Sequence, residues 1–248
     1  MGQDDVVQLH QEILQAIKEN TDSQTLESRL ELLVDDFAKK YPEEGRANAL
    51  HEATSVMFNN DARHHPFFGN LAISAYDSLV TIEKWYDSST IAEHMIGYQI
   101  ELVMNQEGDE DDIRMWFMRW ADSVKKWAII SESPESWQNW GTGILNRCES
   151  FSYAVPGLQY DVYEFWNSMI DTCGTFAPIP EVLERHESEL VQNAVNVRHN
   201  LDSAQLMKRD FTNRVRLLER LDVGDLVDRM NMLIESAPKE LTGDEIEV

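Results

Sequence analysis

The chain has little cysteine and no long apolar run, and these absences exclude several classes of protein. Its 248 residues include only Cys148 and Cys173, too few for a disulfide framework and without the paired spacing of a zinc site. No apolar stretch approaches the roughly eighteen residues that cross a bilayer. The segment Met1–Asp5 is acidic where a signal peptide would be basic. We therefore expect a soluble, cytoplasmic protein that does not contact membranes.

The sequence also lacks the motifs of common active sites. It contains no Gly-x-Ser-x-Gly, no phosphate-binding glycine loop and no dinucleotide glycine fingerprint. Acidic clusters occur at 35–36 and 109–112, but neither has the Asp-Asp-x-x-Asp spacing that would hold magnesium against a diphosphate. We assign no catalytic residue and no cofactor, and we favour a non-enzymatic role while leaving enzymatic activity open.

Basic residues are scarce relative to acidic ones. The sequence has 45 Asp and Glu against 21 Lys and Arg, for a formal net charge of -24. Such a field repels nucleic acids and anionic lipids and attracts basic surfaces, so we do not expect direct nucleic-acid binding. High solubility and adaptation of the host to salt are alternative interpretations of the acidity. An apolar content of 42% is typical of a folded chain.

Apolar residues recur at helical spacing along the chain. Leu26, Leu30, Leu33 and Phe37 form one helical stripe, and the polar segment 21–23 before them supplies a helix cap. No segment alternates with a period of two, and no repeat of roughly 30 to 45 residues is visible. The sequence therefore predicts an all-α fold, a multi-helix bundle with two lobes.

Prolines and caps predict where the next helices begin. Pro42 is expected to open a third helix that ends near Asn59, because proline suits the first helical turn. A fourth helix is expected over 70–85. The polar segment 87–89 is expected to cap a fifth helix that runs to about Gln106.

A sixth expected helix follows the acidic turn 107–112. Trp116, Trp120 and Trp127 share one face of it with further apolar residues. Three tryptophans on one face belong either in a core or in an interface, so we name them as candidate interaction residues. In a core, Trp116→Ala would cost about 3 to 5 kcal/mol of stability.

Two prolines and a glycine between 173 and 180 predict an internal boundary. We expect an acidic, Trp-rich helical lobe at 1–174, a C-terminal helical lobe at 181–236 and a polar, acidic tail at 237–248.

The most basic predicted helix lies in the C-terminal lobe. Lys208, Arg209 and Arg216 on this helix are further candidate interaction residues. Contact with phosphate is one interpretation, but pairing with the acidic surface of the protein itself is simpler.

Histidines and carboxylates support a second hypothesis, a metal-dependent helical enzyme. The candidate ligands are of the types that divalent metals accept: His51, Asp61, His64, His65 and His94. Neither Glu-x-x-His nor His-Glu-x-x-His spacing occurs.

The leading hypothesis is a non-enzymatic, acidic helical protein that binds a basic protein partner or assembles with copies of itself. A narrower version is a viral or mobile-element factor that mimics nucleic acid and occupies a nucleic-acid-binding protein. Salt-sensitive binding to a basic partner is the behaviour that this hypothesis predicts.

Overall fold

The computed structural model describes residues 3–20 and 22–130, together with scattered positions between 143 and 169 and between 212 and 235. The chain divides into two compact units, residues 1–130 and 131–248. The predicted boundary at 173–180 lies outside the described residues.

The first unit consists of α-helices joined by short turns, and the described residues contain no strand. This confirms the predicted all-α, multi-helix fold. In chain order the helices are α1 (Gln3–Glu19), α2 (Ser23–Lys40), α3 (Gly45–Asn59), α4 (Phe68–Thr81), α5 (Trp85–Met104) and α6 (Glu110–Ile130). Among the described residues, no helix is both long enough and apolar enough to cross a membrane.

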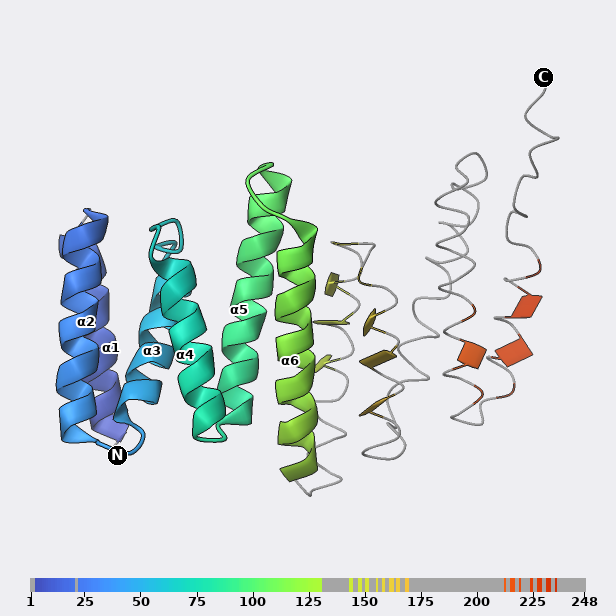
Figure 1. The fold of residues 1–248 in the computed structure, drawn as a ribbon, viewed down its shortest axis with the longest axis horizontal. Coiled ribbons are helices and arrows are strands. Elements are labelled where there is room, and N and C mark those ends of the chain that lie inside the picture. The colour runs from blue at the N-terminus through green and yellow to red at the C-terminus, as the bar shows by residue number, and fades with distance from the viewer. Residues whose placement is uncertain are drawn as a thin grey trace. The chain divides into compact units, whose positions relative to one another are not determined.

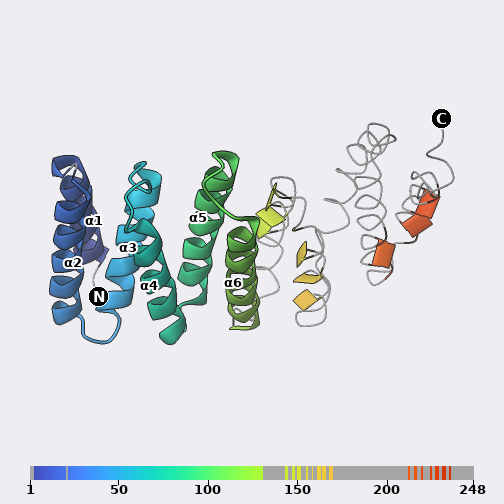
Figure 2. The same cartoon turned by 45° about the horizontal axis from the view of Figure 1, so that its top comes forward.

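The helices of this unit form three successive pairs, α1 with α2, α3 with α4, and α5 with α6, which follow one another in a row (Figures 1 and 2). Because short turns join them, neighbouring helices run antiparallel. The central helix α3 packs against α1, α2, α4 and α5. The pairs begin at Gln3, Gly45 and Trp85, so the structure repeats after about 40 residues although the sequence shows no such repeat.

Asp22 caps α2, as the sequence predicts. Its carboxylate accepts hydrogen bonds from the backbone N–H of Thr25 at 2.8 Å and from the Thr25 hydroxyl at 2.7 Å. These bonds stabilise the ionised carboxylate and lower the pKa of Asp22. The four residues of the predicted stripe, Leu26, Leu30, Leu33 and Phe37, are all buried.

The start of α3 differs from the prediction. Pro42 lies in a turn, and the helix begins at Gly45. A Cβ on Gly45 would lie 2.8 Å from the carbonyl oxygen of Phe37 and from Cβ of Tyr41. The turn therefore closes tightly against the end of α2, and glycine, rather than the proline, marks the first residue of the helix.

The start of α5 also differs. The helix begins at Trp85, ahead of the segment 87–89 that the sequence predicts as its cap. Ser88 and Ser89 are buried, and their hydroxyls donate to the carbonyl oxygens of Trp85 and Tyr86 at 3.0 and 2.7 Å. Serine hydroxyls form hydrogen bonds with the backbone both inside a helix and at its start. Ser88 and Ser89 do so inside α5.

Candidate functional site

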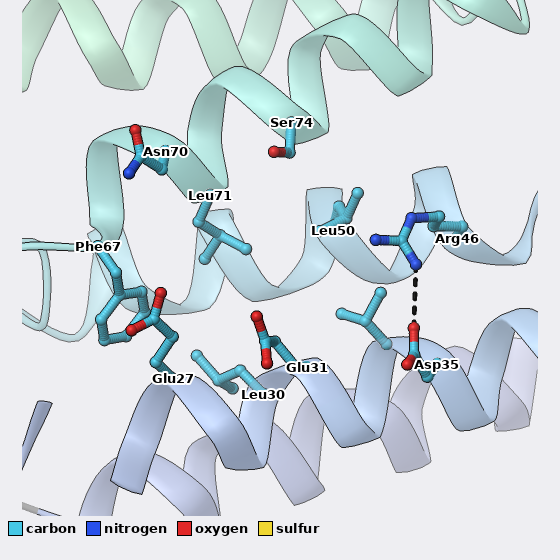
Figure 3. A pocket seen from close by; sticks show the side chains of 11 residues that line it. Glu27, Leu30, Glu31, Asp35, Arg46, Leu50, Phe67, Asn70, Leu71 and Ser74 are labelled. Atoms are coloured by element: carbon cyan, nitrogen blue, oxygen red, sulfur yellow. Dashed lines mark hydrogen bonds and ion pairs between the residues drawn. The ribbon is translucent and has the colours of Figure 1, made fainter. Parts of the chain in front are cut away.

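A groove with a volume of about 350 Å³ lies between α2 and α4 (Figure 3). Both helices pack against α3, which contributes Leu50 and Arg46 to the groove. The remaining apolar lining comes from the two flanking helices and the residue before α4: Leu30, Val34, Leu71 and Phe67. Most of these side chains are buried, whereas Leu71 is partly exposed. The groove therefore has an apolar floor that solvent reaches at Leu71.

One wall of this groove is acidic. Glu27, Glu31 and Asp35 follow one another along α2 at intervals of one helical turn, and all three are exposed. Asp35 forms an ion pair with Arg46 at 3.0 Å at one end of the groove (Figure 3). Within the described part of the chain, Glu27 and Glu31 make neither a hydrogen bond nor an ion pair. These two carboxylates can therefore accept a cation from outside.

The opposite wall is polar but uncharged. Asn70 and Ser74 lie one turn apart on α4, and both are exposed. The negative charge of the groove is thus concentrated on the α2 side.

The predicted tryptophan stripe lies on α6, and two of its three tryptophans are buried. Trp116 and Trp120 are only 1% and 2% exposed. The ring of Tyr76 meets Trp116 edge-on at 5.8 Å, and Arg119 Cζ lies 4.6 Å from the centre of the Trp116 ring. Trp127 is partly exposed and packs against Tyr86. Trp116 and Trp120 thus have the burial of core residues.

Buried hydroxyl groups connect the helices next to these tryptophans. The Tyr76 hydroxyl donates to the carbonyl oxygen of Arg119 at 3.0 Å and lies 3.2 Å from the Ser123 hydroxyl. The hydroxyl oxygens of Ser88 and Ser123 lie 2.9 Å apart, within hydrogen-bond distance. Burial raises the pKa of Tyr76, so this side chain stays neutral and can donate its proton. The network joins α4, α5 and α6 and is structural in character.

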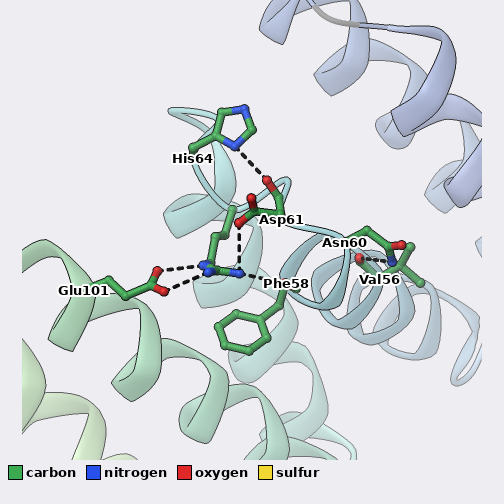
Figure 4. A network of polar contacts seen from close by, with 7 residues as sticks. Val56, Phe58, Asn60, Asp61, His64 and Glu101 are labelled. Carbon is green, nitrogen blue, oxygen red and sulfur yellow. Dashed lines mark hydrogen bonds and ion pairs between the residues drawn. The ribbon is translucent and has the colours of Figure 1, made fainter.

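The loop between α3 and α4 contains three of the predicted metal ligands, each in a local contact. His64 is hydrogen-bonded to the carbonyl oxygen of Asp61 at 2.8 Å (Figure 4), and His65 is hydrogen-bonded to Ser23 at 2.8 Å. Burial is the main cause of a lowered pKa at His65. These contacts fix the loop against itself and against α2.

An arginine holds the same loop to α5. The Nε and Nη2 atoms of Arg63 each donate to a carboxylate oxygen of Glu101 at 2.7 Å, and Arg63 also lies 3.3 Å from Asp61 (Figure 4). The paired hydrogen bonds from Arg63 lower the pKa of the Glu101 carboxyl. Asp61 is therefore engaged by the arginine that orders this loop.

The other two predicted ligands lie where α3 faces α5. His94 stacks on Phe58 with ring centres 4.4 Å apart. Burial, with a smaller effect of His51, lowers the pKa of His94 to about 4, so its imidazole is neutral at pH 7. The Nε2 atom of His51 is buried without a hydrogen-bond partner in the described part of the structure.

The predicted ligands are thus divided between a loop and a helix interface. Within residues 3–20 and 22–130 and the scattered described positions beyond, no three His, Cys, Asp or Glu side chains are grouped so that they could hold a metal ion.

The predicted basic residues lie in the second unit. Lys208 and Arg209 lie outside the described residues, whereas Arg216 is helical and exposed. The groove residues of α2 and α4 were not predicted as a site. The one available signal was the spacing of Glu27, Glu31 and Asp35 beside the apolar stripe of α2. Comparison with protein-family models, curated proteins and solved structures gives no match to this chain.

Proposed function

We propose that the chain is a non-enzymatic, acidic helical protein that binds a basic partner protein through the groove between α2 and α4. One observation carries this proposal. Glu27 and Glu31, which have no partner among the described residues, stand on the wall of a groove with an apolar floor. Exposed carboxylates beside an apolar surface provide both attraction and contact area for a cationic ligand.

The overall charge and the groove have different roles in this proposal. A net charge of -24 attracts basic proteins over a distance and raises their association rate. Because exposed ion pairs contribute only about 0.2 to 1 kcal/mol each, charge alone gives little affinity. Burial of apolar surface on the floor of the groove supplies the affinity that retains a partner attracted by the charge.

The proposal includes a narrower form in which the partner is a nucleic-acid-binding protein. Such proteins carry basic surfaces that meet phosphates, and a field of this sign imitates the charge of nucleic acid. No observation in the described part of the chain favours the metal-dependent alternative, since its predicted ligands are not grouped.

Capture of partners from a host lysate at two ionic strengths tests this function. The immobilised chain is expected to retain a basic protein at about 0.05 M salt and to lose it at about 0.5 M, because salt screens exposed charges. Mass spectrometry identifies the bound proteins. Retention of only acidic or neutral proteins, or binding that does not change with salt, contradicts the proposal.

A further inference from the structure

Resting on the proposed function, we infer that the segment of the partner that occupies the groove is a basic amphipathic α-helix. Such a helix would place apolar side chains on the floor between α2 and α4 and cationic side chains against Glu27 and Glu31.

The spacing of the acidic wall matches a helix that lies alongside α2. Glu27, Glu31 and Asp35 recur every four residues along α2, which corresponds to a repeat of roughly 6 Å along the helix axis. Cations four residues apart on a partner helix recur at the same distance when that helix lies alongside α2.

The arrangement of the helices favours the same occupant. The helices α2 and α4 both pack on α3, and the groove separates their exposed edges (Figure 3). Side-chain rows of a helix pack into grooves of this kind on a helical surface. The partly exposed Leu71 would meet the apolar stripe of such a helix.

The distribution of charge sets the side on which the cations lie. Glu27 and Glu31 on α2 are unpaired among the described residues, whereas the α4 wall presents the uncharged Asn70 and Ser74. Asp35 is already paired with Arg46. The partner helix therefore needs its cationic stripe on one side of its apolar stripe, facing the Glu27 end of α2.

Three synthetic peptides test the inference by fluorescence anisotropy with the full chain at low salt. The first is an alanine-based helix that carries two leucines one turn apart and, beside them, two arginines one turn apart. The second has the same composition with the arginines on the opposite face. The third has the order of the first with a central proline that prevents helix formation.

The first peptide is expected to bind about tenfold more tightly than either of the others, a ratio equivalent to about 1.4 kcal/mol. The double variant Glu27→Gln, Glu31→Gln should lose this preference. The matched control Glu43→Gln, Glu107→Gln should keep it, because both control residues are exposed, outside the groove and equal in charge. Circular dichroism of both variants confirms that they retain the helical fold.

Equal binding of all three peptides, no binding of the first, or an unchanged preference in the groove variant overturns the inference. Tight binding of the proline peptide would identify an extended ligand instead. The proposed function fails separately, when lysate capture yields no salt-sensitive basic partner. If lysate capture yields a salt-sensitive basic partner but the chain shows no preference among the peptides, the helical ligand is rejected and the proposed function stands.

Discussion

Replacing Trp116 by alanine is expected to lower the free energy of unfolding by about 3 to 5 kcal/mol. The side chain is 1% exposed, contacts Tyr76 edge-on and lies under the guanidinium of Arg119. Its removal leaves a cavity and ends both ring contacts. Urea denaturation followed by circular dichroism measures the change.

Met118 provides the matched control on the same helix. Its side chain is 55% exposed, so Met118→Ala should change the unfolding free energy by less than about 0.5 kcal/mol. If Trp116→Ala has an equally small effect but weakens self-association, the tryptophan stripe is an interface and its assignment to the core is wrong.

Acidification from pH 7 to pH 4 is expected to destabilise the fold through His94 by about 3 kcal/mol. The folded-state pKa of His94 is lowered to about 4, mainly by burial, from its ordinary value of 6.5. The unfolded chain therefore binds a proton between these values when the folded chain does not. The stabilising contribution is complete above pH 6.5 and is lost as the pH falls towards 4.

The variant His94→Phe isolates this contribution from that of the many carboxylates. Phenylalanine keeps an aromatic ring against Phe58 but cannot take up a proton. The dependence of unfolding free energy on pH between 4 and 6.5 should therefore be shallower in this variant than in the wild type. Identical slopes in the wild type and His94→Phe contradict a buried, neutral His94.

Local sequence signals predicted the helices that follow strong periodicity. The stripe from Leu26 to Phe37 and the cap at Asp22 predicted α2 within about one residue. The helix α6 begins at Glu110, inside the acidic turn 107–112 that was predicted to precede it. The predicted starts of α3 and α5 were wrong because proline and serine each occur in two kinds of local structure. Pro42 fits a turn as well as a first helical residue, and Ser88 bonds inside a helix as readily as at its cap.

The groove could not be predicted in the same way because it is a tertiary feature. Its walls come from α2 and α4, and residues such as Glu31 and Asn70 are brought together only by the packing of both helices on α3. The histidines show that a suitable residue type does not by itself make a metal site. His51 and His64 are of the right chemical type for a metal site, but the fold places them in separate environments.

In the proposed function, the groove binds the basic partner, and the acidic surface in general does not. Lysate capture with two charge-reversed variants, Glu27→Lys with Glu31→Lys and Glu43→Lys with Glu107→Lys, tests it most directly, since both change the net charge equally. The groove variant is expected to lose the salt-sensitive partner, whereas the control variant is expected to retain it. Equal retention or equal loss in the two variants contradicts the claim.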